Sequence, residues 1–542
     1  MGVSFRIGVR RALLFLLLAT ALLLLSGCGE QKPEPQQVEA TPSPTPFIPL
    51  ITPTPQPRLS AKSAGQLGGV ETSELVVSLV FEGAADDAVM DSIFTALHKQ
   101  DVDGIFFIDG TTAYERPELL KKIAEEEYTI GNAGMILSSR MDLNTAAGNV
   151  HQFERTQSLI LNACGVRPEY VCLSGASYTT ELLQAVTASG LKGAVQPDIF
   201  INRDSFLEAE EVETFVESLV RGSVISIQLG SAEGNYETAT KGLAENKSID
   251  PASTIVNETV EVQPDLHIVE ILTWLLDSFK LNHYTVVTPV ELQDMRQSLL
   301  GDEVALPSAL AARYNISRYT YPVTTAGEPI GISVTRSSEA GDFAKTVFVG
   351  DSVMANLMSY VGWRRETSPE FWDDATFLVS SKLTLEKALI GDEGSPALPM
   401  VDEQRIHIDD ALWILGAKRV YLCLRCENIR AYSEPRYLNN LKVLIYQIRQ
   451  RCPDIEIIVM SIPPAIGART STPSNRQIFQ YNLMVAEMCQ QHGIVFLDTA
   501  SALRNEKGDL RDEYCLDPDM YGTHLNDAGC QALMNFISSN IP

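Results

Sequence analysis

The stretch Val347–Ser352 reads Val-Phe-Val-Gly-Asp-Ser, so that an apolar run leads directly into glycine, aspartate and serine. Such a run is typical of a buried strand that ends in a tight turn, which glycine permits, before a helix begins. Downstream of it, short apolar runs alternate with segments of helical spacing. This alternation predicts parallel strands joined by helices, with the active residues at the carboxyl ends of the strands.

We therefore expect residues 344–542 to form a three-layer α/β/α domain around a doubly wound parallel sheet. The predicted strands are Thr346–Val349, Thr376–Ser380, Arg419–Leu424, Glu456–Ser461 and Ile494–Asp498. The predicted helices are Val353–Tyr360, Asp402–Leu415, Tyr437–Gln450, Arg476–Gln491 and Asp527–Ser538.

A second α/β pattern precedes this one and occupies residues 74–297, with a Pro-, Ser- and Thr-containing connector at 298–343. Its alternation indicates a parallel sheet or a (β/α) barrel. The predicted strands are Val76–Phe81, Gly104–Ile108, Val224–Leu229 and Tyr284–Thr288, and the predicted helices are Ile93–Lys99, Pro117–Glu126, Gln152–Asn162 and Val269–Phe279.

The first residues have the features of an export signal. Basic residues precede the apolar run Ala12–Leu25, which is shorter than the ~20 residues of a bilayer span. The tetrad Leu25–Cys28 resembles a bacterial lipobox, which implies removal of residues 1–27 and lipidation of Cys28. Residues 28–70 are proline-rich, as expected of a stiff linker. The chain is predicted to sit on the extracellular face of the membrane, held only by lipid; a retained membrane anchor is the alternative.

The charge balance restricts the classes of partner. Lys and Arg number 42 against 69 Asp and Glu, which gives a net charge of -27. A chain this acidic repels phosphate backbones, so we exclude general nucleic-acid binding. No pair of Cys-x-x-Cys motifs marks a zinc ribbon, and we predict neither a metal nor a cofactor.

Ser352 is the candidate nucleophile, because its hydroxyl would emerge at the sheet edge beside helix N-terminal amides. His524 precedes the last predicted helix and is the candidate general base. A general base needs an acid on its other ring nitrogen. Asp519 is the preferred candidate for that acid and Asp517 is the alternative.

Several motifs in residues 74–296 carry a family resemblance: Val77–Gly83, Gly104–Ile108, Pro117–Leu120, Thr129–Asn132, Gly165–Pro168, Arg221–Val224 and Tyr284–Thr288. They resemble the polysaccharide deacetylases of carbohydrate esterase family four, which implies a metal held by one Asp and two His. The matching positions here are Gly83, Ala133 and Leu137, and the family's terminal His matches Gln228. None of these can bind a metal as the family does, so we predict an inactive deacetylase-like domain that binds glycan or serves as a spacer.

A second resemblance covers about residues 345–542 and rests on Val347–Ser352, Gly416–Tyr421, Asp512–Cys515, Asp517–Asp519 and Gly522–His524. These segments are similar to the SGNH/GDSL hydrolases, which implies a serine nucleophile and an oxyanion hole.

The oxyanion positions depart from that family. The family's G-x-N-D motif becomes Arg425–Asn428, which puts Glu427 at the position of the asparagine donor. With a one-residue shift Asn428 replaces it, so the predicted oxyanion donors are the Ser352 amide and Asn428. Lys382 falls at the family's oxyanion glycine and is predicted to supply charge there or to neutralise Glu427.

The resemblances together predict a lipid-anchored serine esterase that hydrolyses acyl or acetyl esters of cell-wall or surface glycans. The polysaccharide is the expected partner. The principal alternative is a double pseudoenzyme that binds envelope glycan or a partner protein. Solute capture for a transporter is a third, less favoured reading, because neither region resembles a hinged binding-protein lobe.

Overall fold

The computed structural model describes residues 62–230, 266–302, 343–372, 375–391, 394–425, 434–467 and 474–540. The predicted signal sequence, Cys28, residues 28–61 of the predicted linker, most of the connector and Asn428 lie outside these residues. Residues 62–70 of that linker are described, and Gly65–Leu67 form a strand of the N-terminal sheet, so the folded region begins earlier than the predicted residue 74. None of the described helices combines the length and the apolar character that a membrane span requires.

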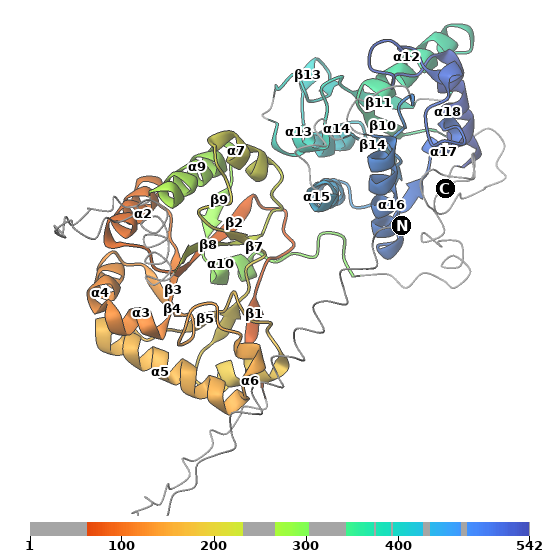
Figure 1. Ribbon diagram of the computed structural model, residues 1–542. Coiled ribbons are helices and arrows are strands. Elements are labelled where there is room, and N and C mark those ends of the chain that lie inside the picture. Colours follow the sequence, from red (N-terminus) through yellow and green to blue (C-terminus); the bar gives the residue numbers. More distant parts are fainter. Residues whose placement is uncertain are drawn as a thin grey trace, which may run out of the picture. The chain divides into compact units, whose positions relative to one another are not determined.

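The N-terminal region is built on one parallel sheet with the strand order β1-β6-β5-β4-β3-β2-β8-β7, to which β9 adds alongside β2 (Figure 1). Every pairing in this sheet is parallel, and the sheet forms a half-barrel. Its strands are β1 (Gly65–Leu67), β2 (Val76–Gly83), β3 (Ile105–Ile108), β4 (Thr129–Asn132), β5 (Tyr170–Cys172), β6 (Gly193–Val195), β7 (Ile199–Ile201), β8 (Val224–Gly230) and β9 (Thr285–Val287).

Helices cover the outer face of this sheet (Figure 1). Apolar residues of β2, β3 and β8 pack with those of α2 and α9 in one large buried cluster. The helices are α2 (Asp87–Gln100), α3 (Gly110–Glu115), α4 (Pro117–Glu125), α5 (Ala146–Cys164), α6 (Thr180–Ala188), α7 (Ala209–Glu217), α9 (His267–Leu281) and α10 (Pro289–Asp294). The predicted α/β class of this region is confirmed.

The C-terminal region has its own parallel sheet, with the strand order β11-β10-β14-β15-β16. The order starts at β10 in the sheet interior and proceeds outward in both directions, which is the doubly wound arrangement. Its strands are β10 (Thr346–Gly350), β11 (Thr376–Val379), β14 (Arg419–Cys423), β15 (Glu456–Met460) and β16 (Val495–Leu497). All five strands that the sequence predicts are present.

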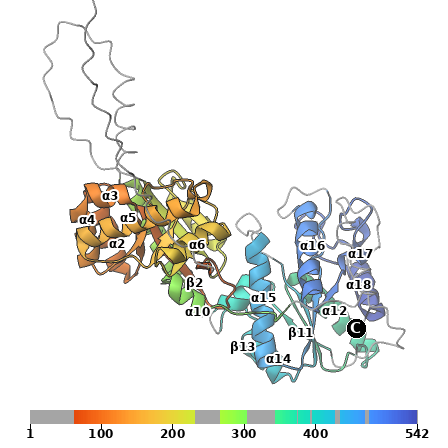
Figure 2. The same cartoon turned by 90° about the horizontal axis from the view of Figure 1, so that it is seen from below.

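Two separate apolar clusters show that this sheet is covered on both faces (Figure 2). Val347 and Val349 point to one face, with α14, α15 and α16, whereas Phe348 points to the other face, with α12 and α18. The helices are α12 (Ser352–Thr367), α13 (Leu385–Ile390), α14 (Ile408–Ile414), α15 (Glu434–Arg451), α16 (Asn475–Gln491), α17 (Ala500–Leu503) and α18 (Asp527–Ser539). This confirms the predicted three-layer fold.

One predicted helix is half wrong. The sequence predicts a helix over Asp402–Leu415, but the first half forms a small antiparallel hairpin, β12 (Met400–Val401) with β13 (Gln404–Arg405). Asp402 and Glu403 make its turn with φ values of 47° and 66°. Two successive residues in the left-handed region reverse the chain and stop a helix, so α14 begins only at Ile408.

Candidate active site

The turn between β10 and α12 places Ser352 at the carboxyl edge of the sheet. A Cβ on Gly350 would lie 2.7 Å from the carbonyl oxygen of Cys423 on the neighbouring strand, so only glycine fits this close approach. The Asp351 carboxylate then accepts a hydrogen bond from the Val353 amide at 2.9 Å and caps α12. Ser352 is therefore the first residue of α12, where backbone N–H groups have no intrahelical acceptor.

His524 lies within hydrogen-bond reach of the serine. The distance from His524 Nε2 to Ser352 Oγ is 2.9 Å, across 172 residues of sequence. The other ring nitrogen, Nδ1, lies 2.7 Å from Asp517 Oδ2. Because a carboxylate only accepts, Nδ1 carries the proton, and Nε2 is then free to accept the serine proton. The structure thus brings the predicted nucleophile and base together.

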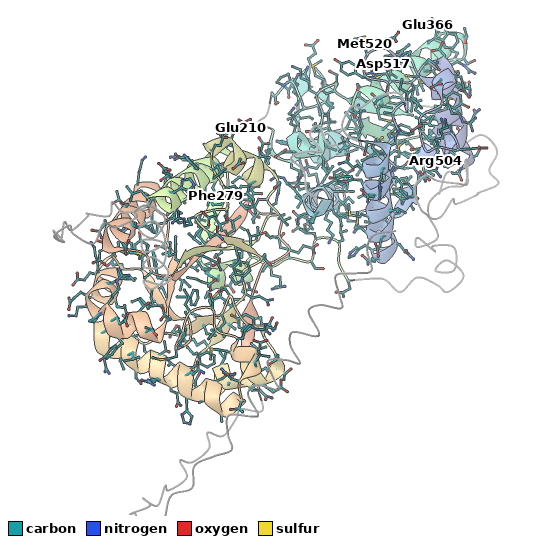
Figure 3. The ribbon with its side chains drawn as sticks, in the orientation of Figure 1. Glu210, Phe279, Glu366, Arg504, Asp517 and Met520 are labelled. Carbon is teal, nitrogen blue, oxygen red and sulfur yellow. The ribbon has the colours of Figure 1, made fainter. Side chains whose placement is uncertain are left out.

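The acid of this arrangement is Asp517, and the preference for Asp519 is corrected. Asp517 Oδ1 accepts hydrogen bonds from the amides of Thr523 and His524 at 3.2 and 3.1 Å, and Oδ2 accepts one from Tyr521. The chain therefore wraps around this carboxylate and presents the histidine ring to it. Figure 3 shows Asp517 beside Met520 in this turn, in agreement with a 3.0 Å backbone hydrogen bond between them.

The electrostatics of the turn favour a charged Asp517. Burial opposes ionisation, but the hydrogen bonds from the His524 ring and amide, the nearby histidine and the Tyr521 amide outweigh it, so the pKa of Asp517 lies below its ordinary value. Its side chain is 11% exposed and that of His524 is 21% exposed. An ionised, shielded carboxylate is what a general base needs to hold its tautomer and to stabilise its protonated form.

Sequence reasoning missed Arg425 as a member of this site. The residue follows β14, which pairs with β10, and its Nη2 lies 3.3 Å from Ser352 Oγ. Its Nε forms an ion pair with Asp351 Oδ2. The signal was present in the sequence, because Arg425 stands at the glycine of the family's G-x-N-D motif.

Within the described residues, neither of the two predicted side-chain groups, Lys382 and Asn428, is found next to Ser352. Lys382 is exposed, its amide donates to Ser380 Oγ at 3.4 Å, and no described contact joins it to Ser352 or His524. Asn428 lies outside the described residues, and so does Glu427. The predicted oxyanion role of Ser352 rests on its backbone amide at the start of α12.

A cavity of about 650 Å³ lies between α12 and α18. Some of the residues that line it are sequence neighbours of Asp517 and His524. Leu516 precedes the acid, and Leu525 and Asn526 follow the base. Its remaining wall is partly aromatic and partly polar, and is formed by Asn356, Ser359, Tyr360, Trp363, Asp527, Ala528 and Cys530.

In the N-terminal region, the positions that match the metal ligands of the deacetylases lie in a tightly packed environment. Gly83 has a φ of +81°, and a Cβ there would lie 2.2 Å from the Gly230 carbonyl oxygen and 2.8 Å from Leu137. Glu82, next to it, is buried and accepts hydrogen bonds from Ser226 Oγ at 2.5 Å and from the Ser174 amide at 3.2 Å. Within the described residues, no group of three or more His, Cys, Asp or Glu side chains is arranged to hold a metal.

Comparisons with known proteins match one family model in each of the two regions. Residues 419–532 match the model of the GDSL-like lipase/acylhydrolase family, a segment that contains Asp517 and His524. Residues 69–194 match the polysaccharide deacetylase model. The chain thus combines a deacetylase-like region with a GDSL-like region, as its sequence predicts. No curated protein matches it.

Solved structures similar to the chain are carbohydrate esterases of family 4. One is a family 4 pseudoenzyme from Bacillus anthracis, with 15% identity and a TM-score of 0.33 over 44% of this chain and 71% of that one. A family 4 esterase from Bacillus subtilis has 14% identity and a TM-score of 0.32 over 43% and 85%. One from Streptomyces lividans has 15% identity and a TM-score of 0.30 over 40% and 94%.

Proposed function

We propose that the protein is a serine ester hydrolase and that its reaction takes place at Ser352. The observation that supports this most is the continuous hydrogen-bond chain from Ser352 Oγ through the His524 ring to Asp517, at 2.9 and 2.7 Å. Nucleophile, base and orienting acid in this order form the constellation of acyl-transfer enzymes. The GDSL-like match supports the same reaction class.

In the proposed mechanism, Ser352 Oγ attacks the ester carbonyl while His524 Nε2 takes its proton. Asp517 keeps the ring in the right tautomer and stabilises the imidazolium. The proton then passes to the leaving alcohol, which leaves an acyl-serine, and a water molecule releases the acid in the same way. The Ser352 amide, at the positive end of the α12 dipole, faces the charge that develops on the carbonyl oxygen.

We further propose that the substrate is an acetyl or acyl ester of a cell-wall or surface glycan. The deacetylase-like region supports a glycan-related role. The cavity between α12 and α18 supports this proposal, because its lining combines aromatic side chains with hydroxyl, amide and carboxylate groups and includes the sequence neighbours of Asp517 and His524. The lipobox-like tetrad at Cys28 supports a location on the extracellular face of the membrane, where the protein would meet this polymer.

Fluorophosphonate labelling tests the proposed reaction. Full-length protein and its Ser352→Ala variant are incubated with the probe and assayed on 4-nitrophenyl acetate. We expect labelling and hydrolysis in the parent chain and neither in the variant, because only an activated serine reacts with this probe. A chain that is neither labelled nor hydrolytic, but binds acetylated polysaccharide, would favour the alternative of a glycan-binding double pseudoenzyme. That alternative is supported by Gly83, Ala133 and Leu137, which stand at the positions of the family's metal ligands and cannot bind a metal as those ligands do.

Trp363 allows the glycan assignment to be tested separately. Its side chain is 54% exposed and lines the cavity. Removal of one aromatic contact costs ~0.5–1.5 kcal/mol, so Trp363→Ala should lower kcat/KM for an acetylated oligosaccharide about 2- to 13-fold. Hydrolysis of 4-nitrophenyl acetate, which does not reach along α12, should remain unchanged.

The matched control is Trp413→Ala. This tryptophan is 56% exposed in the same region but contacts Arg451 on the other side of the sheet and does not line the cavity. Equal losses on both esters in the Trp363 variant, or equal losses in both tryptophan variants, would contradict the proposed glycan site.

A further inference from the structure

The guanidinium group of Arg425 lies next to Ser352, the proposed nucleophile. Arg425 Nη2 lies 3.3 Å from Ser352 Oγ, while Arg425 Nε pairs with Asp351, whose side chain is only 7% exposed. The guanidinium is planar and permanently charged, so these two contacts fix both its position and its orientation. Among the described residues, Arg425 has no partners other than Asp351 and Ser352.

The hydrogen bonds at the serine are mutually compatible. Ser352 Oγ donates its proton to His524 Nε2 and accepts from Arg425, so that both capacities of the hydroxyl are used. A donor 3.3 Å from Oγ is within reach of the carbonyl oxygen of an acyl group that becomes bonded to Oγ. Oxyanion donors must occupy this position before the charge develops.

We propose that Arg425 is the side-chain oxyanion donor of this esterase and takes the place of the asparagine that the G-x-N-D motif would supply. The inference rests on the proposed hydrolysis at Ser352. Arg425 reaches the site from the end of β14, which is next to β10 in the sheet, and Asp351 holds its Nε edge away from the serine. The Nη2 edge and the Ser352 amide then form a two-donor site.

In the proposed reaction, Ser352 is first acylated by the ester. The Oγ–C bond forms, the carbonyl π electrons move to the oxygen, and the serine proton moves to His524 Nε2. Arg425 and the Ser352 amide donate hydrogen bonds to the resulting oxyanion. When the oxygen lone pair returns, the C–O bond to the alcohol breaks and the alcohol takes the proton from His524. Water attacks the acyl-serine by the same sequence, and Arg425 stabilises the second oxyanion as it did the first.

Asp351 has a second task in this arrangement. One of its oxygens caps α12 through the Val353 amide, and the other holds Arg425. The same carboxylate therefore holds the guanidinium directly and caps the first turn of α12, the turn that carries the Ser352 amide. A purely structural ion pair with Asp351 would not require the guanidinium to reach Ser352.

The test compares Arg425→Ala and Arg425→Lys with the parent chain on a neutral ester, 4-nitrophenyl acetate. Loss of one oxyanion donor costs about 10²–10³ in kcat, and we expect this fall for Arg425→Ala with KM changed less than threefold. Millimolar guanidinium ion should restore part of kcat in the alanine variant but not in the parent, because the free ion can occupy the vacated donor position. Arg425→Lys should retain more activity than Arg425→Ala.

Arg419→Ala is the matched control, because Arg419 lies at the other end of β14 and forms an ion pair with Glu456 at 2.7 Å. It should leave kcat unchanged and show no guanidinium response. An alanine variant of Arg425 within threefold of the parent kcat would overturn the proposal, and so would a loss that matches the loss of thermal stability and shows no guanidinium rescue. A parent chain without hydrolysis or fluorophosphonate labelling would instead refute the proposed function itself.

Discussion

Asp517→Ala is expected to lower kcat by about 10³–10⁴-fold, the loss typical of a triad that loses control of its histidine tautomer. The reason is the 2.7 Å contact between Asp517 Oδ2 and His524 Nδ1, which the variant removes together with the acceptors of the Thr523 and His524 amides. Steady-state kinetics on 4-nitrophenyl acetate measure the effect, and near-unchanged fluorescence and circular dichroism would show that the fold survives.

The control for this experiment is Asp519→Ala, which removes a carboxylate of the same turn. Asp519 is exposed and two residues away, and within the described part of the chain the partner of the His524 ring is Asp517 instead. Its kcat should stay within about threefold of the parent value, since exposed charges contribute little. A larger loss for Asp519→Ala than for Asp517→Ala would show that the other carboxylate orients the base.

Gly83→Asp, which restores the metal-binding aspartate of the deacetylases, is expected to destabilise the N-terminal region and to create no deacetylase. The φ of +81° at Gly83 and the 2.2 Å approach of a Cβ to the Gly230 carbonyl combine backbone strain with overpacking. Together these cost about 2–5 kcal/mol. Thermal unfolding of the full chain measures the loss, and release of acetate from acetylated chitooligosaccharide with added Zn²⁺ tests the activity.

Gly230→Asp separates the two causes. Gly230 has nearly the same φ, +79°, but a Cβ there would meet nothing within 4 Å. The aspartate variant at this position therefore bears the backbone strain alone and should be the more stable of the two. Equal unfolding temperatures would show that the contact with the Gly230 carbonyl is relieved at no cost, and deacetylation by Gly83→Asp would contradict the inactive assignment.

Much of the fold follows from apolar periodicity. All five strands of the C-terminal sheet could be predicted, because each is a buried run bounded by polar residues. The N-terminal sheet was predicted less completely: β1, β4, β5, β6 and β7 were missed, and with three or four residues each they carry little periodicity. β9 is equally short but was predicted, because the sequence around it, Tyr284–Thr288, forms a longer strand-like run. The hairpin at Asp402 and Glu403 was missed because no glycine or asparagine marks its left-handed turn.

Part of the candidate site could likewise be predicted from the sequence, and part depends on how the chain folds. Ser352 and His524 could be proposed from the sequence because each lies near the start of a helix, Ser352 as the first residue of α12 and His524 shortly before α18. The choice between Asp517 and Asp519 depends on how an eight-residue turn folds back on itself, which spacing does not determine. Arg425 was missed because its role depends on the approach of β14 to β10, a contact between residues that lie far apart in sequence.

The turn that holds the base is closed upon itself. Met520 and Gly522 donate to the Asp517 carbonyl, and three further amides donate to its carboxylate, so many of the bonds that hold the acid lie within the turn. The Ile466 amide also donates to the Gly522 carbonyl at 2.9 Å and ties the turn to the rest of the domain. The Ser352–His524 contact instead joins residues that are 172 positions apart, so its distance depends on how the domain packs. A substitution in the surrounding core can therefore change how far the nucleophile lies from its base, with less effect on the pairing of the base with its acid.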